Sequence, residues 1–304
     1  MPDLLYIPWF ELKPWEIPFP VLGSIKLQPF GLLVAIGILF GSRIAEWRGE
    51  RRGVPRHLVA DFLVHVVVVG LIVCMLLNVA LYEPEKFAQM GQAIASWFGS
   101  GEKVEFPYPG LSSFGGFLGG TLTALWYRQS KQISLLVLGD IFCFAFPFAW
   151  IFGRSGCFVV HDHPGLVTDF FLAVDDYHGK GMPRHDLGFY EVLWAAVMIP
   201  TVLWLDRKPR PWGFFMAFVP IVYAPIRFML DFLREDAEHG GDVRYLDLTP
   251  GHYYAVLMLL AGVAVAIRVA RGPQPTIMLN GMAPPAPPAP DPAKQPATKK
   301  PRKA

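Results

Sequence analysis

The sequence predicts an all-α membrane protein that crosses the bilayer about seven times. Of its 304 residues, 53% are hydrophobic and 17% are charged, whereas about 25% of the residues of a soluble domain are charged. The mean hydropathy is +0.36, and the apolar residues form runs long enough for membrane helices. These runs, with 14% aromatic residues, exclude a disordered chain, and three cysteines exclude a disulfide scaffold.

The apolar runs place the membrane helices. We expect helices over Leu27–Ile44, Leu58–Tyr82, Leu111–Trp126, Leu135–Phe152, Leu187–Leu205, Trp212–Leu230 and Tyr253–Val269. The third run is short and rich in glycine. Gly116 and Gly120 have the spacing that lets membrane helices approach closely. A re-entrant segment is the alternative for this run.

Basic residues indicate the orientation. They follow the first, third, fifth and seventh helices: Arg48, Arg51, Arg52, Arg56, Arg128, Lys131, Arg207, Lys208, Arg210, Arg268 and Arg271. Because basic loops stay in the cytoplasm, we expect the N-terminus outside and the C-terminus in the cytoplasm.

The flanks and loops complete the expected organisation. Residues 1–271 form one membrane domain with outer loops 83–110 and 154–186, and the first loop holds an amphipathic segment around Trp97 and Phe98. We expect no cleavable signal peptide at the N-terminus, which prolines interrupt. The Pro/Ala-rich, basic tail 272–304 is expected to be disordered.

The first polar cluster follows the fourth predicted helix, within residues 153–165. Arg154 lies between glycines at the edge of the apolar zone, where a guanidinium fork can hold two phosphate oxygens. His161, Asp162 and His163 follow, and an imidazole can accept and return a proton near neutral pH. The alternative is an arginine that only anchors a helix end. The glycines and the three polar residues favour a functional site.

The second cluster ends the sixth predicted helix. Tyr223, Arg227, Asp231 and Arg234 are spaced by four, four and three residues, which places them on one helical face. Two arginines around one carboxylate indicate an anion site, and an ion pair that only offsets charge is the alternative.

The fifth helix begins with a third group, His185, Tyr190 and Glu191. Glu191 either orients an arginine or stabilises the helix N-terminus, and the residues alone leave both roles open.

Two other chemistries are weakly indicated. His161 and His163 have the donor types of a zinc site, but one intervening residue on an irregular loop does not predict a metal. Cys157 lies near a cation, which favours a thiolate, although no nucleophile motif frames it or Ser112 and Ser113.

Together these segments resemble the bacterial prolipoprotein diacylglyceryl transferase family. The most specific match is the loop Gly153–Gly165, followed by Tyr223–Arg234. Arg184–Glu191 resembles the family's His-Pro-x-Gln-Leu-Tyr-Glu element, and Ser112–Gly119 its Ser-Phe-His-Gly-Gly segment. The similarity extends from Pro29 through the last helix and leaves out the tail.

The resemblance implies a reaction. Enzymes of this family move diacylglyceryl from phosphatidylglycerol to the thiol of a lipobox cysteine in a prolipoprotein, and glycerol-1-phosphate leaves. It implies that Arg154 and Arg227 clamp the phosphate. His161 and His163 lie close to Arg154 in the sequence, so either is a candidate proton acceptor, and Asp162 between them is counted among the catalytic residues. The implied substrate-binding residues are Arg154, Gly156, Gly165, Glu191, Tyr223, Asp231 and Arg234.

Several family positions differ in this chain. The family's Gly-Asn-Phe is Gly156-Cys157-Phe158, and its later Asn-x-Glu is Val160-His161-Asp162. A tyrosine near the first helix is Phe30, a histidine is Phe114, and the Glu of Glu-x-x-Arg is Asp231.

The implied partners are phosphatidylglycerol, a prolipoprotein signal peptide with its lipobox cysteine, and membrane lipids. We expect no cofactor, no metal and no nucleic-acid partner, and a multi-pass location in the bacterial inner membrane. The alternatives are a divergent paralogue that binds phosphatidylglycerol but modifies another acceptor or none, and a transporter. The transporter is disfavoured because the ionisable residues cluster at the outer edge of the helices.

Overall fold

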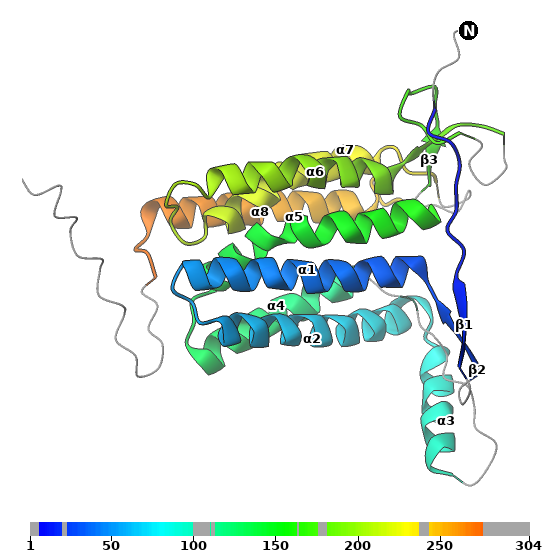
Figure 1. Ribbon diagram of the computed structural model, residues 1–304, viewed down its shortest axis with the longest axis horizontal. Helices are drawn as coiled ribbons and strands as arrows, with labels where there is room; N and C mark the ends of the chain where they lie inside the picture. The colour runs from blue at the N-terminus through cyan, green and yellow to red at the C-terminus, as the bar shows by residue number, and fades with distance from the viewer. Residues whose placement is uncertain are drawn as a thin grey trace, which may run out of the picture.

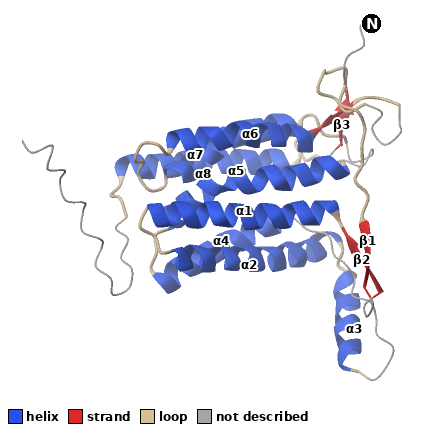
Figure 2. Ribbon diagram, in the orientation of Figure 1, coloured by secondary structure: helices blue, strands red, loops and turns tan. Residues whose placement is uncertain are grey.

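Seven long helices run side by side in one bundle (Figure 1). The computed structural model describes residues 6–19, 23–99, 110, 113–162, 164–175, 181–236 and 243–275. The long helices are α1 (Pro29–Arg51), α2 (Arg56–Tyr82), α4 (Ser113–Lys131), α5 (Leu135–Val160), α6 (Leu187–Leu205), α7 (Phe214–Asp231) and α8 (Pro250–Arg271). Helices dominate and strands are few and short (Figure 2), which confirms the prediction of an all-α membrane protein.

Among the described residues, six helices are long and apolar enough to cross a membrane: α1, α2, α5, α6, α7 and α8. The remaining predicted span, Leu111–Trp126, corresponds to α4. This helix is continuous from Ser113 to Lys131 and runs the length of the bundle beside α2 (Figure 1). It is therefore a helix and not a re-entrant hairpin.

Successive long helices run in opposite directions, so the connections alternate between the two ends of the bundle (Figure 1). The end where α5 and α7 finish and α6 and α8 begin is called the site end below. The opposite end, which is called the basic end, holds the C-terminus of α8 and the α1–α2 turn, with Arg51, Arg52 and Arg56 at or beside that turn. The side of the membrane that each end faces stays a prediction.

Glycines let α4 approach α2, as this glycine-rich run predicts. A Cβ on Gly115 would come within 2.5 Å of the Cys74 Cα, and one on Gly119 within 2.9 Å of the Gly70 Cα. Gly116 and Gly120 have ordinary contact distances of 3.9 and 3.8 Å to side chains of α2. The closest approach is therefore at Gly115 and Gly119. Both pairs have the same spacing, so the sequence alone does not show which one faces α2.

Two small sheets and a short helix lie at the site end. Strand β1 (Trp15–Phe19) pairs antiparallel with β2 (Gly23–Leu27), and β3 (Pro164–Val167) with β4 (Arg184–Asp186). Helix α3 (Lys86–Phe98) runs across the direction of the bundle (Figure 1) and exposes Trp97 and Phe98. The predicted amphipathic segment is therefore a helix. The tail beyond residue 275 lies outside the described residues.

Helix α5 is central, because it packs against α1, α6 and α7. The Ser134 side chain caps its first turn by accepting from the Leu136 N–H. Its side chains reach both apolar cores: Val137, Leu138 and Ile141 belong to one, and Phe144 and Phe148 to the other. A residue near the end of α5 is therefore held rigidly against α6 and α7.

A buried ionic network closes the basic end. Arg48 on α1 and Asp140 on α5 are both fully buried, and Arg48 Nη2 lies 2.7 Å from Asp140 Oδ2. Arg48 Nε also lies 3.3 Å from Asp206 Oδ1. The second Asp140 oxygen accepts from the Phe215 N–H at 2.7 Å. The network joins α1, α5 and the α6–α7 connection.

We predict that Asp140→Ala lowers the free energy of unfolding by about 3–5 kcal/mol, because it removes the closest partner of the buried Arg48 charge and leaves only the longer contact to Asp206. Thermal unfolding in detergent measures this. Arg43→Ala is the control, since the Arg43 side chain is 70% exposed beside Glu46 and such pairs contribute about 0–1 kcal/mol. Equal losses in the two variants would contradict the prediction.

Candidate active site

A buried carboxylate, Glu191, is the centre of the polar cluster at the site end. It lies in the second turn of α6 and is fully buried. The Glu191 carboxylate faces Arg154 from α5, and its Oε1 also lies 3.2 Å from Arg227 Nη1 of α7. Its Oε2 accepts from the Tyr223 hydroxyl at 2.5 Å and from the Trp150 indole N–H at 2.9 Å. Four donors from two other helices therefore converge on one carboxylate.

Asp231 forms a second centre beside the first. Arg227 Nη2 lies 2.7 Å from Asp231 Oδ1, and Arg234 Nε lies 3.3 Å from the same oxygen. The Thr249 hydroxyl donates to Asp231 Oδ2 at 2.5 Å. Thr249 is also the N-cap of α8, so Asp231 lies at the positive end of a helix dipole. Arg227 bridges the two carboxylates.

The two centres together have a net positive charge. Arg154, Arg227 and Arg234 contribute three positive charges, and Glu191 and Asp231 two negative ones. Tyr223, Trp150 and Thr249 are neutral donors. His252 accepts from the Thr249 backbone N–H at Nδ1 (3.1 Å) and adds no charge. Three arginines in a largely buried site favour an anion as ligand.

Close packing fixes the second centre. A Cβ on Gly251 would lie 1.8 Å from Asp231 Oδ2 and 3.1 Å from Arg227 Nη2. Only glycine leaves room there for the carboxylate at the start of α8. Neither Gly251 nor Thr249 was predicted as a site residue from the sequence. The Thr-Pro pair that signals the start of α8 is a cue to Thr249.

His161 lies in a different set of contacts. Its Nδ1 is 2.7 Å from Asp186 Oδ2, and its Nε2 is 2.6 Å from the Phe10 carbonyl oxygen. Both partners are hydrogen-bond acceptors, so a ring N–H of His161 can donate to either of them. Asp186 Oδ1 in turn accepts from the Phe189 N–H and caps α6. His161 therefore joins the end of α5 to the start of α6, which brings Arg154 and Glu191 together.

Asp162 and Cys157 also belong to the first cluster. Asp162 is exposed, and His163 lies outside the described residues. The Cys157 thiol is buried, and its Sγ accepts from Arg154 Nη1 at 3.4 Å. Within the described part of the chain, no group of three His, Cys, Asp or Glu residues could hold a metal ion. The Cys157 thiol thus contacts the Arg154 guanidinium, which we expect to bind phosphate.

The predicted glycines lie where chain segments touch. A Cβ on Gly156 would lie 3.0 Å from the Phe30 ring, and one on Gly165 would lie 2.7 Å from the Leu233 carbonyl oxygen. The Leu166 N–H also donates to that carbonyl. The loop after α5 is thus held against the end of α7. Direct contact between these glycines and a substrate stays a prediction.

His185 and Tyr190 form a separate pair before α6. His185 Nδ1 lies 2.7 Å from the Tyr190 hydroxyl oxygen. Burial lowers the pKa of His185, so the ring is neutral at pH 7 and can accept a proton. Of the third predicted group, only Glu191 enters the charged cluster.

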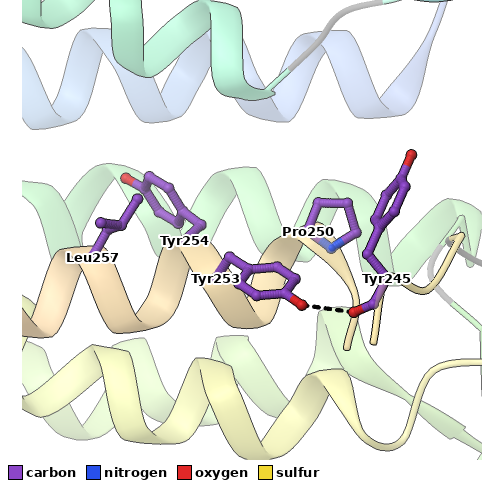
Figure 3. A pocket seen from close by; sticks show the side chains of 5 residues that line it. All are labelled: Tyr245, Pro250, Tyr253, Tyr254 and Leu257. Carbon is purple, nitrogen blue, oxygen red and sulfur yellow. Dashed lines mark hydrogen bonds between the residues drawn. The ribbon is translucent and has the colours of Figure 1, made fainter. Parts of the chain in front are cut away.

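An apolar groove begins beside the second centre. Its volume is about 390 Å³, and Tyr245, Pro250, Tyr253, Tyr254 and Leu257 line it (Figure 3). The Tyr253 hydroxyl donates to the Tyr245 carbonyl at 2.6 Å. Phe117 of α4 lies 4.5 Å from the Tyr254 ring, centroid to centroid. The groove therefore starts at the N-terminus of α8, next to Thr249.

A protein-family model matches most of the chain. The family model described as prolipoprotein diacylglyceryl transferase matches residues 17–268, a span that contains the whole charged cluster. The chain belongs to this family. The resemblance inferred from the sequence motifs is therefore confirmed.

Relatives support the same assignment. The phosphatidylglycerol–prolipoprotein diacylglyceryl transferase of Chromohalobacter salexigens is 28% identical over 256 residues, which cover 83% of this chain and 91% of the relative. The Vibrio parahaemolyticus protein of that name is 26% identical over 257 residues, with 81% and 88% covered. The Chlorobaculum tepidum protein is 30% identical over 183 residues, with 59% and 62% covered.

We predict that Gly251→Ala displaces Asp231 and lowers the melting temperature by several degrees, because the added methyl group overlaps the carboxylate. Differential scanning fluorimetry in detergent measures the shift. Gly91→Ala is the matched control, since no atom lies within 4 Å of a Cβ at that position in α3. A smaller shift for Gly251→Ala than for Gly91→Ala would overturn this view of Gly251.

Proposed function

We propose that this chain transfers the diacylglyceryl group of phosphatidylglycerol to the lipobox cysteine thiol of a prolipoprotein. The main support is the buried cluster in which Arg154 and Arg227 converge on Glu191. The headgroup phosphate of phosphatidylglycerol is a monoanion, and guanidinium groups hold phosphate oxygens through paired N–H donors.

The reaction increases the charge on the phosphate. The sulfur forms a bond with the glyceryl carbon, and the bond from that carbon to the phosphate oxygen breaks. The electron pair leaves with that oxygen, so the phosphodiester monoanion becomes the phosphomonoester dianion of glycerol-1-phosphate. The thiol proton goes to an acceptor on the enzyme or to water.

Arg154 and Arg227 are suited to stabilise this charge. Both guanidinium groups lie on Glu191 Oε1, so they are adjacent and held before the substrate binds. Preorganised cations favour the transition state over the bound lipid, because the negative charge on the phosphate grows during the step. Glu191 and Asp231 keep the two arginines from repelling one another, and Arg234 supports Asp231.

Two candidate proton acceptors, Asp162 and His161, differ in their exposure to solvent. Asp162 is exposed just after the end of α5, five residues after Cys157, whose thiol contacts Arg154. Both ring nitrogens of His161 are already engaged, one with Asp186 and one with the Phe10 carbonyl oxygen. His161 can therefore act as the base only if one of these contacts breaks. We propose that Asp162 or His163 accepts the thiol proton and that His161 holds the loop in place.

The lipid tails and the membrane complete the proposal. The apolar groove at the start of α8 accommodates acyl-chain atoms while the headgroup lies at the arginines. The chain is a multi-pass membrane protein. We propose that it lies in the bacterial cytoplasmic membrane with the site end outside, where a secreted prolipoprotein arrives, and the basic end in the cytoplasm.

We predict that Arg154→Lys and Arg227→Lys each lower transfer about 10²- to 10³-fold, because lysine keeps the charge but lacks the planar fork. The assay uses proteoliposomes of phosphatidylglycerol and a lipobox peptide with one cysteine, and mass spectrometry detects the added diacylglyceryl group. Arg43→Lys, at an exposed site of α1, is the control.

Each outcome of that assay has a meaning. Transfer by wild type and by Arg43→Lys, with loss in both site variants, supports the proposal. Full activity of either site variant would contradict the clamp. Binding of phosphatidylglycerol without any transfer by wild type would favour the paralogue that only binds lipid.

We predict that Asp162→Asn lowers transfer without changing the melting temperature, whereas His161→Ala lowers both, because His161 ties α5 to α6. Transfer rates and thermal unfolding are measured on the same preparations, together with His163→Ala and the His161→Ala, His163→Ala double variant. Unchanged transfer in Asp162→Asn and in His163→Ala would exclude both acceptors, and unchanged transfer in the double variant would exclude the histidines altogether.

A further inference from the structure

Trp150 contacts both members of the central ion pair. It lies four residues before Arg154 on α5, so the two side chains share one face of the helix. Its indole N–H donates to Glu191 Oε2 at 2.9 Å. Its ring centroid is 5.1 Å from Arg154 Cζ, within the range of a cation–π contact. No other described side chain touches the guanidinium and the carboxylate in these two ways.

Aromatic neighbours hold the Trp150 ring in place. Phe146 stacks on it with centroids 4.8 Å apart, and the Tyr223 ring lies 6.0 Å away nearly edge-on. Phe146 precedes Trp150 by one helical turn. The indole therefore has a fixed orientation before any substrate binds.

The indole N–H controls how Glu191 presents its two oxygens. Trp150 and Tyr223 both donate to Oε2, so Oε1 faces Arg154 and Arg227. Without the indole donor, the carboxylate is freer to turn and to offer both oxygens to one guanidinium, as carboxylates do in paired contacts with arginine. That pairing would draw N–H groups of the arginine away from a phosphate.

The ring face has a complementary effect. An aromatic face attracts the Arg154 cation without supplying an acceptor oxygen. Trp150 therefore holds Arg154 in place and leaves the N–H donors of the guanidinium available to an anionic ligand. A second carboxylate at this position would occupy those donors. This effect matters most when the phosphate gains its second negative charge.

We infer that Trp150 is a positioning residue that holds Arg154 and Glu191 in the arrangement required by the phosphomonoester dianion, an inference that rests on the proposed transfer reaction. Trp150 acts through these two side chains. The resemblance to the family did not point to this position. Its signal in the sequence is the aromatic residue one turn before Arg154.

The chain offers a matched control in Trp194. Its ring also lies against Tyr223, 4.6 Å away, and it is buried in the aromatic core against which the half-buried Trp150 packs. Its Nε1 has no hydrogen-bond partner among the described residues. Trp194→Phe thus makes the same chemical change in the same core without removing a bond to Glu191.

The test compares Trp150→Phe, Trp150→Leu and Trp194→Phe in phosphatidylglycerol proteoliposomes. We expect Trp150→Phe to lower kcat by about tenfold and Trp150→Leu by about a hundredfold, since misplaced catalytic groups lose rate on this scale. The KM for phosphatidylglycerol stays within about threefold in all variants. Trp194→Phe keeps the wild-type kcat.

A second readout does not depend on turnover. Binding of glycerol-1-phosphate to the same proteins in nanodiscs is measured by calorimetry, and we expect Trp150→Phe to weaken it about tenfold while Trp194→Phe leaves it unchanged. Absence of transfer by wild type would refute the proposed function alone. Equal kcat and equal glycerol-1-phosphate affinity in Trp150→Phe and Trp194→Phe would refute the role of Trp150. An equal loss in both variants would indicate core packing and refute it too.

Discussion

The site depends on a single carboxylate that is buried and fully paired. An isolated carboxylate at the Glu191 position would be costly to bury, and so would two arginines without an anion. Together they are compatible with the interior, because Glu191 accepts from Arg154, Arg227, Tyr223 and Trp150. The helices α5, α6 and α7 must meet at this depth for the contacts to form. The charged group therefore constrains the bundle as much as the bundle positions the charges.

The two ends of the bundle use buried charge differently. At the basic end, Arg48 and the neighbouring Arg52 are balanced by Asp140 and Asp206, and aromatic rings surround Arg48. At the site end, Arg154 and Arg227 share one carboxylate oxygen of Glu191. Guanidinium groups in a low-dielectric setting attract an anion strongly. The first arrangement stabilises the fold, whereas the second can also bind an anionic ligand.

Most of the bundle and half of the site follow from the sequence. Apolar runs indicate the helices, and the spacing of Tyr223, Arg227, Asp231 and Arg234 places them on one face. The sequence did not decide the role of Glu191, since a first-turn acid and an arginine partner look alike until α5 and α6 are packed. Trp150, Thr249 and Gly251 were missed because their roles come from contacts between helices.

The most direct test of this account is the rate of diacylglyceryl transfer by Glu191→Gln in phosphatidylglycerol proteoliposomes. Glutamine keeps the size of the side chain but removes its charge, so the two arginines lose their common anion and their placement. The account predicts a loss of at least about a hundredfold in kcat in protein that remains folded at the assay temperature. A wild-type rate in folded Glu191→Gln would contradict the claim that this carboxylate organises the site.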